Sequence, residues 1–249
     1  MFMTIFRSMI VTALRDRISL FYSILFPAGL LIGLGLYFDS PEYRFTLLTG
    51  TVVLSTVFWS VQGTAFQVHQ QRSRGVYKLL KVTPCSNLSF VFNMTLARTV
   101  LGLMINGIIL AGGIIAFGIS ISGANLAVLG FMLALGTLCF TAMGFFVTNL
   151  ARNEAQINMF SNLLYIPMLF GSETFYSLQS APQWIKTAGN LFPLTYLVKG
   201  VRFSFTDLGE VLPYVGIVTA YTIALIFLAA LTFRWDAEQP LLSRRSHSV

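Results

Sequence analysis

The stretch QQRSRGVYKLLKVTP, from Gln70 to Pro84, is the least hydrophobic run of its length in the first half of the chain. The residues around it are unusually apolar. Of 249 residues, 55% are hydrophobic and only 10% are charged, and 23 are Phe. Soluble domains are nearer a quarter charged. The composition therefore indicates a membrane protein in which the 70–84 stretch is a polar interruption.

Apolar windows long enough to cross a bilayer occur six times. A hydrocarbon core about 30 Å thick needs roughly 20 mostly apolar residues per helical span. Such windows lie near residues 18–38, 45–68, 99–120, 124–150, 156–176 and 211–233. The first is too long for a signal-peptide core and has no small-residue cleavage site. We therefore expect one all-α domain of six spans over residues 1–249.

Basic residues are distributed unevenly between the two sides of this predicted bundle. The N-terminal segment, the loops after spans two and four, and the C-terminal tail hold 12 Lys and Arg residues, whereas the other loops hold 4. Cytoplasmic loops are enriched in Lys and Arg, so both termini and the 70–84 stretch are predicted to be cytoplasmic. A basic rim beside anionic lipid explains the net charge of +7 without nucleic acid as a partner.

The 70–84 stretch has the pattern of a short amphipathic helix over residues 73–83. Ser73 is a suitable N-cap, apolar and basic residues recur on separate faces, and Pro84 ends the pattern. A helix lying on lipid headgroups would have the same pattern, and residues 1–17 fit that interpretation well. The 73–83 helix joins two spans that a few residues could connect, which favours a protein partner.

Several motifs resemble those of ABC-2-type transporter permeases. GVYKLLKVTP at 75–84 is similar to the family's loop after the second span. FGS at 170–172, APQWI at 181–185, NLFPLTY at 190–196 and Arg202 resemble its outer region between spans five and six. The order, spacing and predicted sidedness of these motifs agree along the whole chain.

The resemblance implies that the 73–83 helix is a coupling helix seated in a groove of a separate ATP-hydrolysing subunit. The implied docking residues are Arg74, Gly75, Val76, Lys78, Leu79, Leu80 and Val82. Family members often carry Glu where Arg74 and Lys78 stand here, so we expect an acidic groove on the partner. The resemblance also implies two ATPase subunits and a second permease, identical or homologous.

The sequence offers no site for ATP or a metal ion in this chain. It contains no G-x-x-x-x-G-K-[ST] phosphate loop. Its two histidines, His69 and His247, have no carboxylate or cysteine neighbours at metal-ligand spacing. We therefore expect this chain to bind no cofactor, to have no catalytic residues, and to depend on ATP and Mg²⁺ bound by the partner ATPase.

The region over residues 177–205 is too apolar for a free loop, yet Pro182, Asn190 and Pro193 divide it into pieces too short to span. We expect short helices that dip into the outer leaflet. The resemblance implies that this region caps the translocation path, and an interfacial aromatic belt is the alternative. Candidates for the outer gate or pathway are Glu173, Phe175, Trp184, Phe192 and Tyr196.

Two prolines lie inside predicted spans, Pro27 in the first and Pro167 in the fifth. Each would kink its helix and leave a backbone carbonyl that a neighbouring group must satisfy.

The expected function is export of an amphipathic or hydrophobic molecule, such as a drug, lipid, peptide or glycolipid, across the plasma membrane of a bacterial or archaeal cell. Multidrug resistance is one form of that activity. The alternative is an ion- or proton-coupled secondary transporter or channel, which would carry ionisable residues deep in its spans. Only Glu173 approaches that pattern, and its spacing from Gln156 puts it near the outer surface.

Overall fold

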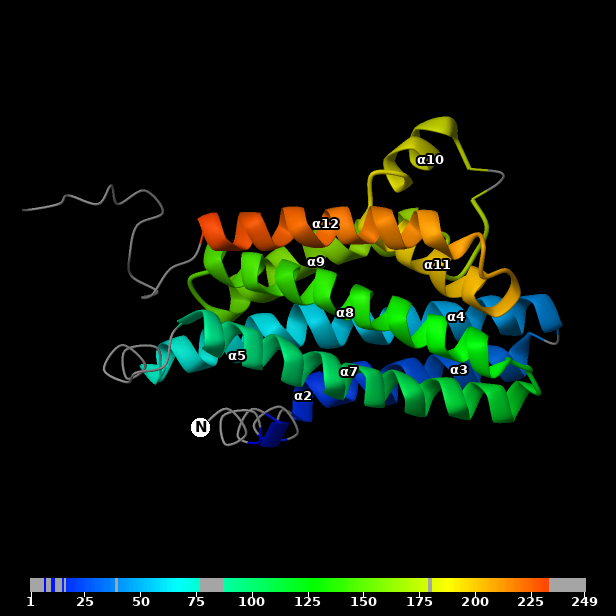
Figure 1. Cartoon of the computed structure of the whole chain (residues 1–249), viewed down its shortest axis with the longest axis horizontal. Helices are drawn as coiled ribbons and strands as arrows, with labels where there is room; N and C mark the ends of the chain where they lie inside the picture. Colours follow the sequence, from blue (N-terminus) through cyan, green and yellow to red (C-terminus); the bar gives the residue numbers. More distant parts are fainter. Residues whose placement is uncertain are drawn as a thin grey trace, which may run out of the picture.

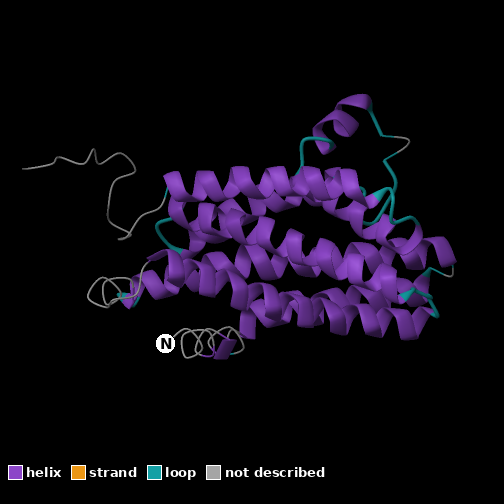
Figure 2. Cartoon of the chain, in the orientation of Figure 1, coloured by secondary structure: helices purple, strands orange, loops and turns teal. Residues whose placement is uncertain are grey.

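The computed structural model describes residues 17–38, 40–76, 87–178 and 181–232, together with positions 7, 10, 11 and 15. Helices and short turns make up this part of the chain, and none of its residues forms a strand (Figure 2). The all-α prediction is therefore confirmed. Most of the predicted interfacial helix over 1–17 and of the coupling helix over 73–83 lies outside the described residues.

The first apolar segment is a continuous helix of α2 (Arg17–Leu20), the π-helical η1 (Phe21–Leu25) and α3 (Phe26–Tyr37). Pro27 is the second residue after the π-helical turn. Because proline has no N–H, the Ser23 carbonyl cannot receive the usual bond from four residues later. The hydroxyl of Ser55, in the next long helix, donates to that carbonyl at 2.6 Å. The predicted need for a neighbouring donor is thus met by a side chain of the second span.

The second long helix consists of α4 (Pro41–Val57), the π-helical η2 (Phe58–Gln62) and α5 (Gly63–Ser73). The Ser40 hydroxyl caps its start by accepting from the Tyr43 amide at 3.4 Å. The most apolar window of this helix is 83% buried inside the bundle, compared with 11% for α12 (Val211–Leu231). The second helix is therefore an interior helix, and α12 presents most of its surface outward.

The other long helices are α7 (Asn87–Phe117), α8 (Gly123–Leu150) and α9 (Glu154–Gly171). α8 packs against α4, η2 and α5 on one side and against α7, α11 and α12 on others. The helices run side by side along the length of the molecule (Figure 1). α8 and the second long helix together form the centre of the bundle.

Two short helices separate α9 from α12. They are α10 (Gln183–Gly189) and α11 (Pro193–Thr206). α11 packs against α8 and α12, whereas α10 projects to the side of the bundle near one end (Figure 1). The division of this region into short helices agrees with its Pro and Asn pattern, and its depth in a bilayer stays a prediction.

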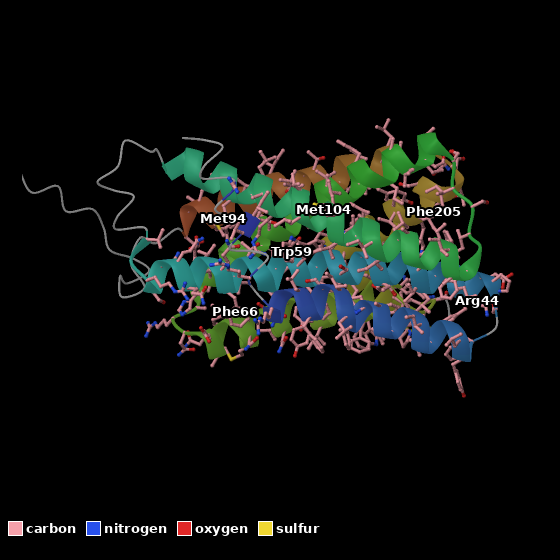
Figure 3. All side chains as sticks on the ribbon, turned by 90° about the horizontal axis from the view of Figure 1, so that it is seen from below. Arg44, Trp59, Phe66, Met94, Met104 and Phe205 are labelled. Atoms are coloured by element: carbon pink, nitrogen blue, oxygen red, sulfur yellow. The ribbon has the colours of Figure 1, made fainter. Side chains whose placement is uncertain are left out.

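The long helices alternate in direction. The ends of α5, α8 and α12 near Ser73, Leu150 and Leu231 meet at one end of the bundle, which we call the inner end. The opposite end carries α10 and the ends of α3 and α7, and we call it the outer end. Arg44 and Phe205 are labelled at the outer end in Figure 3. These names follow the predicted orientation.

Four of the described helices are long and apolar enough to cross a membrane. They are Pro41–Ser73, Met94–Phe117, Gly123–Leu150 and Val211–Leu231. The Phe21–Tyr37 helix is apolar but shorter, and α9 carries polar residues in its first turns, including Glu154 and Asn158. The count of six spans therefore stays a prediction. The structure has a helix at each of the six predicted windows.

Gly144 marks the closest approach between α8 and the second long helix. A Cβ atom at this position would lie 2.6 Å from the Val61 carbonyl oxygen and 2.9 Å from that of Ser60. Both are backbone atoms of the interior helix and cannot move aside as a flexible side chain would. Small residues allow such close contacts between helices in membranes, so this crossing requires glycine.

We expect Gly144→Ala to destabilise the protein by about 1 to 3 kcal/mol, the usual cost of inserting a methyl group into a packed contact. Gly130→Ala, in the same helix, is the matched control, because no atom lies within 4 Å of its added Cβ. Alanine there should be neutral or stabilising by up to about 1 kcal/mol. Thermal unfolding in detergent measures both changes. Equal melting temperatures for the two variants would contradict the packing assigned to Gly144.

The predicted orientation can be tested with single cysteines at Ser73 and Gln183, which are exposed at opposite ends of the bundle. In a background lacking Cys85 and Cys139, a membrane-impermeant thiol reagent applied to intact cells should label Gln183→Cys only, because the basic end is expected in the cytoplasm. Permeabilised cells provide the control in which both should react. Labelling of Ser73→Cys in intact cells would reverse the orientation.

Candidate functional site

The predicted docking segment, residues 73–83, begins at a sharp helix end. α5 ends at Ser73, and the Gly75 amide donates to the Arg72 carbonyl at 3.0 Å. Gly75 has a φ of +71°, a conformation that glycine adopts at helix ends without a steric penalty. The expectation that Ser73 is the N-cap of a new helix is wrong, since Ser73 is the last residue of α5. Val76, directly after the glycine, is helical.

The other predicted docking residues can be placed only in part. Arg74 is exposed, and Gly75 and Val76 are partly buried at the inner end. The rest lie outside the described residues: Lys78, Leu79, Leu80 and Val82.

Arg72 connects the end of α5 to the end of α8. Its side chain is buried, with 7% of its surface exposed. The guanidinium donates to the Thr148 carbonyl at 3.3 Å and to the Asn149 Oδ1 at 2.9 Å. The last carbonyls of a helix carry partial negative charge and have no partner within the helix. An arginine placed there holds the ends of two helices together.

Asn149 extends this contact to α12. Its side-chain amide donates to the Ala229 carbonyl at 3.0 Å and to the Thr232 hydroxyl at 3.3 Å. The same side chain thus accepts from Arg72 and donates to α12. We call Arg72, Thr148, Asn149, Ala229 and Thr232 the inner clasp. It joins the inner ends of α5, α8 and α12.

Arg98 is the residue before the predicted third span, and it lies within α7 and is 1% exposed. Its guanidinium donates to the carbonyls of Trp59 and Gly63 at 3.0 and 2.5 Å. It also donates to Gln67 at 2.8 Å and lies 4.9 Å from the centre of the Trp59 ring. In return, the Trp59 indole donates to the Arg98 carbonyl at 2.9 Å. α7 and the π-helical segment of the interior helix are therefore locked together.

An aromatic cluster joins the first and second long helices to α9. The Phe58 ring centre lies 6.0 Å from Tyr22, 6.0 Å from Phe26 and 5.1 Å from Tyr165. Tyr22 and Phe26 each remain 41% exposed, whereas Phe58 is buried. Such ring arrangements contribute about 0.5 to 1.5 kcal/mol per contact beyond the burial of area. The edges of the Tyr22 and Phe26 rings are exposed on the side of the bundle.

A polar contact lies beside this cluster. The Gln62 amide donates to the Asn158 Oδ1 at 2.9 Å, joining η2 to α9 at an exposed position. Exposed amide groups in contact with lipid chains lose hydrogen bonds to water. This face of the bundle therefore suits a neighbouring protein or a water-containing path better than lipid.

At the outer end, Glu173 occupies a tight turn after α9. It has a φ of +52°, and its carboxylate accepts from the Leu178 amide at 2.9 Å. Arg202 of α11 donates to the carbonyls of Glu173 and Thr174 at 2.7 and 3.2 Å, and to the Thr49 hydroxyl at 3.3 Å. Burial lowers the pKa of the Arg202 guanidinium, and the charge of Glu173 opposes that change. Arg202 thus ties α11 and the turn to α4.

Two glycines let the outer turn approach the bundle. A Cβ at Gly50 would lie 2.2 Å from the Thr174 carbonyl and 3.1 Å from the Phe175 ring. A Cβ at Gly171 would lie 3.0 Å from the ring of Phe192. Phe175 and Phe192, both predicted pathway residues, therefore pack against helices at the outer end.

The remaining pathway candidates differ in their surroundings. Tyr196 donates to the Asn190 carbonyl at 2.7 Å, and its ring stacks on Tyr221 of α12 at 6.2 Å. Trp184 on α10 is 72% exposed. The five predicted residues thus lie in one outer region, but only Trp184 has a largely free side chain.

Buried polar residues and long apolar helices with outward-facing apolar surfaces define a multi-pass membrane protein. The family model for ABC-2 type transporters matches residues 1–206. The chain therefore belongs to the ABC-2 type transporter family, whose members are membrane subunits of ABC transporters. The resemblance found in its motifs is confirmed.

Similar proteins come from algae and an amoeba in the comparisons. A protein of Pyropia yezoensis named as transport permease ycf38 is 20% identical over 181 residues, covering 70% of this chain and 62% of its own. ABC transporter G family member 20 of Dictyostelium discoideum is 26% identical over 204 residues, covering 78% of this chain and 27% of its own. The chain thus spans less than two thirds of the length of these relatives.

The contacts of the outer region predict different effects for two aromatic substitutions. Tyr196→Ala should lower stability by about 1 to 3 kcal/mol, because it removes a hydrogen bond and a ring contact. Trp184→Ala should change stability by no more than about 0.5 kcal/mol, as is usual at exposed positions. Thermal unfolding in detergent compares them, and Tyr196→Phe, which keeps the ring, is the control. A larger loss in Trp184→Ala would show that the Trp184 side chain packs against the bundle.

Proposed function

We propose that this chain is the permease subunit of an ATP-driven exporter and forms half of a dimeric membrane unit. Membership of the ABC-2 type transporter family supports association with an ABC ATPase subunit. ATP and Mg²⁺ would bind only to that partner. The second permease would be identical or homologous, and the predicted topology of six spans with cytoplasmic termini belongs to this proposal.

The observation that carries the proposal is the exposed start of the 73–83 segment at the inner end. The glycine turn at Gly75 ends an interior helix, and Arg74 beside it is exposed. A partner docked on the following residues would act directly on the helix that contacts α8, α7 and α9. Movement of this segment could therefore change the packing of the whole bundle.

The substrate path would run along the face where the first and second long helices meet α9. This face presents the exposed rings of Tyr22 and Phe26, with the Gln62–Asn158 contact beside them. Aromatic surfaces with few polar groups bind amphipathic or hydrophobic molecules. A drug, lipid, peptide or glycolipid fits this description, and multidrug export is one such activity. The outer region of Glu173, Phe175, Trp184, Phe192 and Tyr196 would form the exit.

An ion- or proton-coupled transporter or channel is the alternative. It would need ionisable groups near the middle of the membrane. Glu173 instead closes a turn at the outer end, with its carboxylate bonded to a backbone amide. Arg72 and Arg98 bind helix carbonyls. These contacts favour an energy source outside the chain.

We place the protein in the plasma membrane of a bacterial or archaeal cell. The predicted inner side holds 12 basic residues and the other side 4. This difference supports an orientation with both termini in the cytoplasm, beside an anionic leaflet. Membrane lipids are then the other partners of the outward-facing apolar residues.

The proposal is tested by capture of the ATPase on variants of the docking segment. Leu80→Ala should weaken capture strongly, because apolar anchors in a protein groove typically contribute about 2 kcal/mol or more, equivalent to roughly 30-fold in affinity. Leu36→Ala is the matched control, since Leu36 is 77% exposed in α3 toward the outer end. Undiminished capture by Leu80→Ala, with binding to anionic liposomes reduced instead, would show that the segment is a lipid-surface helix.

Charge at the docking segment gives a second readout of the same experiment. Arg74→Glu should weaken capture by like-charge repulsion if the groove is acidic, and Arg74→Gln should weaken it less. The difference between the two should shrink as salt is raised, because exposed charges are screened over a Debye length of about 8 to 10 Å. Equal capture by both variants at low salt would contradict an acidic groove.

A further inference from the structure

We propose that Arg72 is the positioning residue that transmits movement of the docking segment to the inner ends of α8 and α12, through its hydrogen bonds to Thr148 and Asn149. This inference rests on the proposed function, because it assumes that an ATPase moves the docking segment. In this account, the buried side chain of Arg72 connects the docking segment to the rest of the bundle.

The position of Arg72 in the chain is the first argument. It lies three residues before Gly75, and its own carbonyl accepts the Gly75 amide at 3.0 Å. Glycine at this point, with a φ of +71°, follows the end of the regular helix of α5. A force on the segment would reach α5 through its last turn, where Arg72 is buried and has side-chain hydrogen bonds to another helix.

The geometry of the contacts is the second argument. The Arg72 guanidinium bonds a backbone carbonyl and a side-chain carbonyl at 3.3 and 2.9 Å, both at the end of α8. Planar, charge-assisted hydrogen bonds are directional, unlike apolar contacts, which tolerate sliding. Displacement of Arg72 would therefore pull the end of α8 or break these bonds.

Asn149 provides the next step. Its Oδ1 accepts from Arg72, and its Nδ2 donates to the Ala229 carbonyl of α12. The Asn149 side-chain amide thus bonds both Arg72 of α5 and the Ala229 carbonyl of α12, and Asn149 is completely buried. Movement of the α5 end is transmitted to two helices rather than one.

The route continues to the outer region through packed side chains. Gly136 of α8 lies against Leu197 of α11, and a Cβ there would come within 2.7 Å of that side chain. The rings of Phe203 on α11 and Tyr214 on α12 stack at 5.5 Å. Because α11 contacts α8 and α12, two of the three helices that the inner clasp joins, a shift of α8 relative to α12 would alter the packing of α11 at the outer end.

A purely structural role is the alternative to transmission. In that case Arg72 would only cap α8, and its loss would reduce stability without changing how the outer region responds to nucleotide. The two roles differ in a measurable property, the dependence of outer-end accessibility on the state of the ATPase.

The experiment uses the full complex with its ATPase, reconstituted in liposomes, with Gln183→Cys as a reporter in a background lacking Cys85 and Cys139. The rate of labelling by a thiol reagent is measured without nucleotide and after trapping with ATP and vanadate. We expect nucleotide to change the rate in the parent complex. Arg72→Gln should diminish that change by about 2- to 30-fold, the range found for residues that carry coupling between sites.

Arg152→Gln is the matched control, because Arg152 is an exposed arginine at the inner end, three residues after Asn149. It should keep the full nucleotide response. Asn149→Ala should resemble Arg72→Gln, and the double variant should be no worse than the more severe single variant, because both remove one connection. Asn149→Ala also serves as the test if the Arg72→Gln complex does not assemble.

The outcomes separate the inference from the proposed function. Retained ATPase capture with a lost nucleotide response in Arg72→Gln or Asn149→Ala supports transmission through Arg72. A full nucleotide response in assembled Arg72→Gln and Asn149→Ala complexes would overturn the inference and leave the proposed function intact. Absence of ATPase capture by the parent chain would overturn both.

Discussion

The close contact between α8 and the interior helix at Gly144 is the constraint on which the rest of the structure depends. It brings the backbone of α8 against the carbonyls of Ser60 and Val61, inside the π-helical η2. Thr148, one turn further along α8, donates to the Ala65 carbonyl at 3.1 Å. The same alignment places the end of α8 beside Arg72. The central pair therefore sets the positions of α7, α11 and α12 around it.

Polar side chains in this bundle repeatedly donate to backbone carbonyls at or near irregular points of the helices. Ser55 donates to the Ser23 carbonyl before Pro27, Arg98 to carbonyls of the second long helix, and Arg202 to the turn after α9. Unsatisfied backbone groups are costly where water is scarce. Each irregular point is thus also a point of contact between helices.

Apolar length predicted most helix positions, because lipid imposes a simple requirement on composition. It placed α8 and α12 within two residues of their observed ends. It could not find Arg72 and Arg98 as buried residues, because counting charges assigns every arginine to a loop, and their carbonyl partners come from other helices. Ser73 was interpreted as a cap because the continuation of α5 depends on burial against α8. Likewise, Tyr196 gave no signal of its stacking on Tyr221, which is distant in the chain.

The central claim is that this permease takes its energy from a separate ATPase, and the mass of the particle purified in mild detergent tests it most directly. Native mass spectrometry should show this chain with a second permease and a pair of ATPase subunits, in a particle that hydrolyses ATP. The contradicting result is a chain that purifies without an ATPase and, reconstituted alone, carries a flux driven by an ion gradient. Membership of the ABC-2 type transporter family supports association with an ATPase, and the second permease in that particle is part of the proposed function.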